Sequence, residues 1–150
     1  MANRFTGFPA DAFGFYADLE LDNSKPFWAD NKHRYEASVA GPMGDLLADL
    51  ADEFGAGRMF RPYRDVRFSA DKSPYKDHQG GYVEVGPACG YYVQVSSGGL
   101  MVGAGWYSPT TEQVARYRSA IDEGVHGPAL RAELARLEKA GMEVGGDVVR

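Results

Sequence analysis

A short segment in the middle of the chain, residues 58–78, gathers cationic side chains and hydroxyl groups. Six cations there face three aspartates, so the segment carries +3 within a chain whose formal net charge is −5. Guanidinium groups offer planar pairs of donors and ammonium groups offer point charges, which is how proteins hold phosphate and carboxylate. We therefore expect an anion-binding site here. Its candidate ligand-binding residues are Arg61, Arg64, Arg67, Ser69, Lys72 and Lys76.

Two further side chains of this segment are candidates for orienting the ligand or moving a proton. His78 is the natural acid–base group if the site is catalytic, since an imidazole titrates near neutrality, and Tyr75 offers a hydroxyl. The competing structural interpretation is that the aspartates pair with the cations and the segment braces the sheet. Three aspartates cannot neutralise six cations, so both interpretations stay open. The sequence does not decide whether the chain is an enzyme.

The first half of the segment is expected to be extended, because Pro62 disfavours a helix and Val66 favours a strand. Alternation then places Phe60, Val66 and Phe68 on one face, with Arg64 among them. A buried guanidinium needs carboxylate and carbonyl partners. Either Arg64 is paired inside the protein or a bulge turns it outward. The second half is polar and predicts a loop.

Helices are expected before this segment. Apolar residues at helical spacing predict one over residues 9–21, and Asn23-Ser24 provides the N-cap of a second. A third, opened by Pro42 and stopped by Gly55, carries the clearest apolar stripe. These helices are expected to form a packing layer.

Strands are expected over residues 80–107, with Gly98-Gly99 as a two-residue hairpin loop that pairs Ser97 with Leu100. One face of the hairpin is then apolar and suited to lie on the helices; it holds Tyr91, Val93, Val95, Val102, Ala104 and Trp106. The other face holds Tyr92, Gln94, Ser96, Met101, Gly103, Gly105 and Tyr107.

Gly103 and Gly105 leave a strip of bare backbone on that second face, flanked by Tyr92 and Gln94. The strip is consistent with a groove floor on which a ligand or another chain lies close to the sheet. It is equally what a bend, a bulge or a closely packed helix would require.

The last third returns to helix, first after the capping box Thr110-x-x-Gln113 and then from Gly127-Pro128 to Gly141. We predict a single α+β domain over residues 1–150, with N-terminal helices, a central antiparallel sheet with the Gly98-Gly99 hairpin, and C-terminal helices packed on one face.

Composition narrows the class of protein. The chain has 150 residues, 44% hydrophobic and 13% aromatic, as a soluble globular protein does. No apolar stretch is long enough for a membrane span, and the single cysteine, Cys89, favours a cytoplasmic location. His33, His78 and His126 lack metal-ligand spacing, and no nucleotide-cofactor or nucleophile-elbow motif occurs, so no metal and no cofactor are expected.

The same central segment resembles the signature of the bacterial and fungal family called domain of unknown function 2461. The resemblance is carried by the run from Phe60 to His78, by residues 5–9 and 23–36, and by Tyr91-Tyr92-Val93 and Gly103-Ala104-Gly105-Trp106. It spans essentially the whole chain. The order Phe27-Trp28 and the proline at position 62 depart from the family pattern.

The resemblance implies these fold boundaries and this segment, but no reaction, since the family has no assigned activity. Family members commonly continue beyond the equivalent of residue 147, so we expect the chain to lack a C-terminal extension.

The main functional hypothesis is a cytosolic domain that binds a small phosphate- or carboxylate-bearing ligand through residues 58–78. The alternative is a non-enzymatic module that docks a protein or nucleic acid and holds a structural Arg–Asp network. The net charge of −5 disfavours nucleic acid as a partner. The sequence does not indicate an oligomeric state.

Overall fold

The computed structural model describes residues 4–146. The chain forms two compact units, the first ending at Tyr107 and the second beginning at Ser108. The first holds the N-terminal helices and a four-stranded antiparallel sheet, and the second holds two helices. The α+β class is confirmed. No helix within residues 4–146 is long and apolar enough to cross a membrane.

The first two helices follow their sequence signals. Helix α1 spans Ala10–Leu21 and α2 spans Lys25–Arg34. Ser24 caps α2, because its hydroxyl oxygen accepts a hydrogen bond from the Phe27 N–H at 3.2 Å. Both predicted helix starts are therefore confirmed to within a residue.

The predicted break before Pro42 is wrong. Helix α2 continues through a π-helical stretch, η1 (Tyr35–Ala40), directly into α3 (Gly41–Asp49), with α4 (Ala51–Phe54) following. The Gly41 N–H bonds the Glu36 carbonyl five residues back. Proline has no N–H to give, and the wider turn ahead of it lets the helix pass without a cap. Gly55, at φ 97°, ends the run as predicted.

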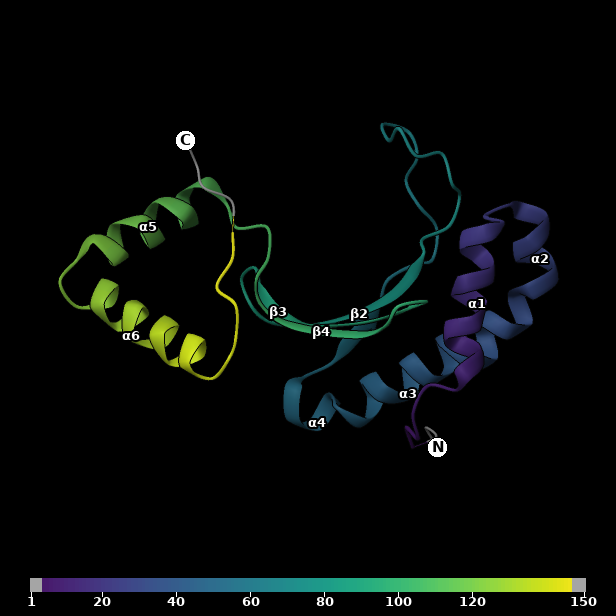
Figure 1. Cartoon of the computed structure of the whole chain (residues 1–150), viewed down its shortest axis with the longest axis horizontal. Coiled ribbons are helices and arrows are strands. Elements are labelled where there is room, and N and C mark those ends of the chain that lie inside the picture. Colours follow the sequence, from purple (N-terminus) through teal and green to yellow (C-terminus); the bar gives the residue numbers. More distant parts are fainter. Residues whose placement is uncertain (1–3, 147–150) are drawn as a thin grey trace. The chain divides into compact units, whose positions relative to one another are not determined.

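The sheet has the order β1-β2-β3-β4, all antiparallel. The strands are β1 (Gly57–Met59), β2 (His78–Gly86), β3 (Cys89–Ser96) and β4 (Gly99–Trp106). The strands curve, and α3 and α4 lie along their convex side (Figure 1).

The β3–β4 hairpin is confirmed, but its loop lies one residue earlier than predicted. The turn is Ser97-Gly98, and Ser96 pairs with Gly99. Gly99 is the residue that takes a positive φ, 115°, and so begins β4. The Ser97 hydroxyl donates to a carboxylate oxygen of Glu20 on α1, which ties the turn to that helix.

This register differs from the predicted one by two residues, so every side chain stays on its predicted face. Val95 on β3 and Val83 on β2 join the core beneath the sheet with Met43 and Leu47 of α3. Over β4 the same face is open, since Val102 is 78% exposed. The helical cover predicted for the hairpin therefore holds for β3 but not for β4, and the helices cover β2 as well.

The extended strand predicted for residues 60–68 is wrong. After β1 the chain leaves the sheet and returns on itself, with the Arg64 N–H bonding the Pro74 carbonyl and the Lys76 N–H bonding the Pro62 carbonyl. The residues between form a loop, in which Phe68 is 96% exposed. Pro62 has no N–H for a continued ladder, which is consistent with the early end of β1.

The second unit contains α5 (Thr111–Asp122) and α6 (His126–Lys139). Thr110 and Gln113 form the predicted capping box, each side chain bonding the other's backbone N–H. Gly141, at φ 84°, follows the end of α6. The helices predicted for this part of the chain are confirmed.

Candidate functional site

A pocket of about 640 Å³ lies on the face of the sheet opposite α3 and α4. Its floor is the open face of β2, β3 and β4, and Lys76 and His78 line it from the segment that enters β2. The floor includes Tyr82, Gly90, Tyr92, Gln94, Gly103 and Gly105, and Phe60, Trp106 and Tyr107 also line the pocket. The apolar floor and the few polar groups are typical of a small-molecule site.

Two tyrosine rings lie low on this floor because glycines stand beneath them. A Cβ on Gly80 would come within 2.6 Å of the Tyr92 hydroxyl, and a Cβ on Gly90 would come within 2.5 Å of the Tyr82 hydroxyl. The Tyr92 hydroxyl donates to Gln94 Oε1 at 2.7 Å. Burial, with Tyr107 nearby, raises the pKa of Tyr92, so this hydroxyl stays a donor at neutral pH.

The glycines of β4 leave open space above the floor. A Cβ built on Gly103 or Gly105 would meet no atom within 4 Å. The β3–β4 pairing runs through both positions without a bulge. Of the interpretations left open by the sequence, the structure therefore excludes a bulge and a closely packed helix and leaves the groove floor and a bend.

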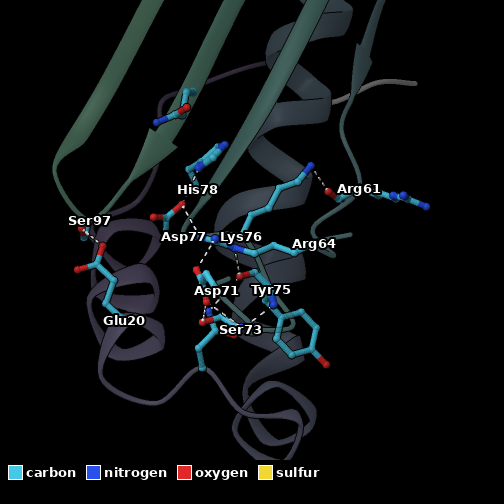
Figure 2. Close-up of polar contacts among 12 residues, drawn as sticks. Glu20, Arg61, Arg64, Asp71, Ser73, Tyr75, Lys76, Asp77, His78 and Ser97 are labelled. Atoms are coloured by element: carbon cyan, nitrogen blue, oxygen red, sulfur yellow. Dashed lines mark hydrogen bonds and ion pairs between the residues drawn. The ribbon is translucent and has the colours of Figure 1, made fainter. Parts of the chain in front are cut away.

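Lys76 lines the pocket. Its ammonium group is oriented by the backbone of Arg61 (Figure 2). Its ammonium group donates to the Arg61 carbonyl at 3.0 Å and lies 5.6 Å from the centre of the Phe60 ring. Burial and, after it, the charges of Arg61 and Arg64 lower the pKa of Lys76. An ammonium has three donors, so those not engaged by Arg61 are available to a ligand.

His78 is oriented by the carboxylate next to it. Its Nδ1 lies 2.7 Å from Asp77 Oδ1, and its ring lines the pocket. Burial alone would raise the pKa of Asp77, but His78, a backbone hydrogen bond and the charge of Arg64 together outweigh it and the pKa is lowered. In the tautomer that donates its Nδ1 proton to Asp77, the Nε2 atom is the acceptor.

Arg64 is paired, as the first of the two alternatives required, but on a partly exposed loop and not inside the protein. Its side chain is 28% exposed and lies 2.5 Å from Asp71 Oδ2 and 3.6 Å from Asp77 Oδ1. Its Nε donates to the Tyr75 carbonyl at 3.0 Å (Figure 2). Arg64 therefore braces the loop and holds Asp77 beside His78.

The other candidates lie on the loop. Arg67 pairs with Asp65 at 2.6 Å, and the Lys72 ammonium donates to the Val66 carbonyl at 2.9 Å. Arg61 is exposed, and Ser69 is half-buried and does not line the pocket. Among the six predicted ligand-binding residues, the structure brings Lys76 to the pocket and leaves the other five outside it.

The pairing explains where the excess charge of the segment resides. Asp65 forms an ion pair with Arg67, while Asp71 and Asp77 form ion pairs with Arg64. No carboxylate of residues 4–146 lies within 4.0 Å of the three remaining cations of the loop, which are Arg61, Lys72 and Lys76. In the same described part of the chain, no group of three metal-ligating side chains occurs.

Tyr75, the second catalytic candidate, belongs to the core instead of the pocket. It is 6% exposed, and its ring stacks on Trp28 at 4.1 Å between centroids. Asn23 bonds both the N–H and the carbonyl of Tyr75. Burial and the neighbouring Tyr63 raise its pKa. This packing fixes the backbone from which Lys76 and His78 project.

The sequence interpretation missed a buried link directly behind the site. The Tyr35 hydroxyl donates to Gln79 Oε1 at 2.7 Å, and Gln79 Nε2 donates to the Phe60 carbonyl at 2.6 Å. Gln79 is 1% exposed, and burial raises the pKa of Tyr35 to about 12. The link fixes β2 between His78 and Gly80. The sequence signal that could have indicated this link is a polar residue, Gln79, on the apolar face of β2.

Comparison with known proteins gives one match. The family described as conserved hypothetical protein (DUF2461) matches residues 11–147. No curated protein and no solved structure matches the chain. The matched range takes in the sheet, the pocket-lining residues and the Arg–Asp network. The chain therefore belongs to the DUF2461 family of conserved hypothetical proteins.

Proposed function

We propose that this protein binds a small ligand carrying a phosphate or carboxylate group in the pocket on the open face of the sheet. The observation that supports it is Lys76, a cation without a carboxylate partner in residues 4–146, held half-buried at the pocket. Uncompensated positive charge in a partly desolvated site attracts anions strongly. The other cations of residues 58–78 contribute in two ways: their charge raises the local positive potential, and their ion pairs hold the loop in place.

The electrostatics around Lys76 support an anion instead of a cation. Arg61 and Arg64 are close enough to lower the pKa of Lys76, after the larger effect of burial. An anion bound to the ammonium would relieve that repulsion and gain charge-assisted hydrogen bonds. In this proposal the ligand supplies the carboxylate or phosphate that the protein's own aspartates do not.

His78 supplies a group that can exchange a proton with the bound ligand. Asp77 holds its Nδ1, and the ring lines the same pocket as Lys76. A histidine so oriented can act as general acid or base toward a phosphate or carboxylate ester. Arg64 contributes by position, since it holds Asp77 at 3.6 Å.

The test compares two lysines of the same segment that make the same kind of contact. Both Lys72 and Lys76 donate to a backbone carbonyl, but Lys76 lines the pocket and Lys72 does not. Binding of inorganic phosphate and of acetate is measured by calorimetry on the wild type, Lys76→Met and Lys72→Met. We expect Lys76→Met to weaken binding roughly tenfold or more and Lys72→Met to change it less than about twofold.

Absence of binding by the wild type at tens of millimolar anion contradicts the proposal. Equal losses in the two variants contradict the placement of the anion at the pocket. The alternative, a module that docks nucleic acid on the loop cations, predicts polymer binding that falls steeply with salt. A cytoplasmic location is part of the proposal and is tested by fractionation of cells that express the tagged chain.

A further inference from the structure

The pocket floor presents a surface of aromatic rings. Tyr82 on β2 pairs with Tyr92 on β3, and Phe60, which follows β1, lies 6.4 Å from the Tyr82 ring and 6.3 Å from the Tyr92 ring. The two tyrosine rings lie across glycines of the neighbouring strand. Their free faces therefore meet the pocket, as a flat ligand would require.

We propose that the ligand is a nucleoside monophosphate, with its base stacked on Tyr82 and Tyr92 and its phosphate held by Lys76. This inference rests on the proposed anion site and adds the chemistry of the rest of the ligand. Stacking on aromatic side chains accepts any base, because every base has a π-face.

The distribution of charge in the pocket favours one phosphate over several. Lys76 and His78 are the ionisable groups that line it besides the tyrosines. The rest of the lining is aromatic, aliphatic, glycine or amide. A ligand with a single anionic end and a large uncharged flat end matches that pattern, whereas a triphosphate needs more cations.

The same pattern disfavours a nucleic-acid strand. A strand needs a row of cations that tracks its backbone. The strands β2–β4, from His78 to Trp106, contain no lysine or arginine at all, and the chain as a whole carries −5. A volume of about 640 Å³ is the size of a small-molecule site.

Gln94 is placed to bond the edge of the base. Its Oε1 accepts from the Tyr92 hydroxyl, which fixes the amide beside the ring that carries the base. Gln94 lines the pocket. Its Nε2 group has no hydrogen-bond acceptor among residues 4–146. An amide nitrogen offers two donors, which suit the carbonyl or ring nitrogen of a base.

Gly103 allows the base site to be blocked without harm to the fold. A Cβ there would meet no atom within 4 Å, and valine is better than glycine in a strand. We therefore expect Gly103→Val to fold normally while filling the open space on the pocket side of β4, beside its strand partner Tyr92. Val102→Ile, which adds bulk to the opposite face of the same strand, is the matched control.

The experiment titrates inorganic phosphate, AMP and UMP into the wild type and both variants by calorimetry at one salt concentration. We expect the wild type to bind AMP and UMP roughly tenfold or more tighter than phosphate. Gly103→Val should lose that advantage and keep its affinity for phosphate, and Val102→Ile should keep both. Circular dichroism and thermal melting check that each variant is folded.

The outcomes separate the two proposals. Equal affinity for phosphate and nucleotides overturns the nucleotide proposal and leaves the anion site standing. An unchanged nucleotide advantage in Gly103→Val also overturns it. Failure of phosphate and nucleotides alike to bind overturns the anion site itself. Tighter binding of poly(U) than of UMP, with a steep dependence on salt, would assign the face to a strand instead.

Discussion

Removal of the Tyr35 hydroxyl probes the buried link that holds β2 behind the pocket. In Tyr35→Phe the ring stays and packs as before, but Gln79 Oε1 loses the donor that lies 2.7 Å away. Gln79 is 1% exposed, so water cannot replace the hydroxyl without a rearrangement of the core. The variant therefore isolates one hydrogen bond.

The magnitude follows from that burial. A buried acceptor left without a donor costs about 1–3 kcal/mol. For a chain of this size each kilocalorie lowers the melting temperature by roughly 2–4 °C, so a fall of about 4–8 °C is expected for a loss near the middle of the range. The assay is urea unfolding followed by circular dichroism, with thermal melting as a second readout.

A double-mutant cycle with Gln79→Met sharpens the result. Gln79→Met also removes the donor to the Phe60 carbonyl, so it should cost more than Tyr35→Phe. Gln79→Met also leaves the buried Tyr35 hydroxyl without its acceptor, and the double variant removes that unpaired hydroxyl. The double variant should therefore be at least as stable as Gln79→Met alone. Additive losses, or a Tyr35→Phe variant within about 0.5 kcal/mol of wild type, would refute the reasoning.

Three further predictions, made with four variants, test other parts of the fold. Arg34 pairs with Asp11 at 2.7 Å and lowers the pKa of that carboxyl from 3.8, against the opposing effect of burial. The pair therefore stabilises the fold above pH 3.8, and this stabilisation is lost as pH falls through the folded pKa. Urea midpoints measured from pH 5 to pH 2.5 should fall less steeply in Asp11→Asn, and equal slopes would contradict the pairing. Gly90→Ala places a Cβ against the Val83 carbonyl oxygen and the Tyr82 ring, and should cost about 2 kcal/mol in urea unfolding; an unchanged midpoint would contradict this close approach of the Val83 backbone. Arg64→Met should lose about 2 kcal/mol by the same assay, whereas Arg67→Met, whose pair with Asp65 is exposed, should show no measurable change; the reverse order would contradict the brace.

The sequence allowed the local features of the fold to be predicted. Caps such as Ser24 and Thr110 act within one turn, so their neighbours along the chain are sufficient to identify them. The faces of β3 and β4 were predicted despite the misplaced turn, because a shift of two residues preserves the alternation.

The features that were missed depend on pairs far apart in the chain. The bond between Tyr35 and Gln79 joins a π-helical turn to a strand, and no periodicity indicates it. The direction of Lys76 into the pocket follows from the core packing of Tyr75 on Trp28, which spacing alone does not reveal. The charge pattern indicated the segment that contributes Lys76 and His78, but which of its side chains line the pocket was set by tertiary packing.

Amide chemical-shift mapping with inorganic phosphate tests the central claim most directly. A titration of the ¹⁵N-labelled full chain should shift the amides of Lys76, His78 and their pocket neighbours, and the shifts should disappear in Lys76→Met. Shifts confined to the exposed loop around Arg67 and Lys72, or none at saturating phosphate, would contradict an anion site on the open face of the sheet.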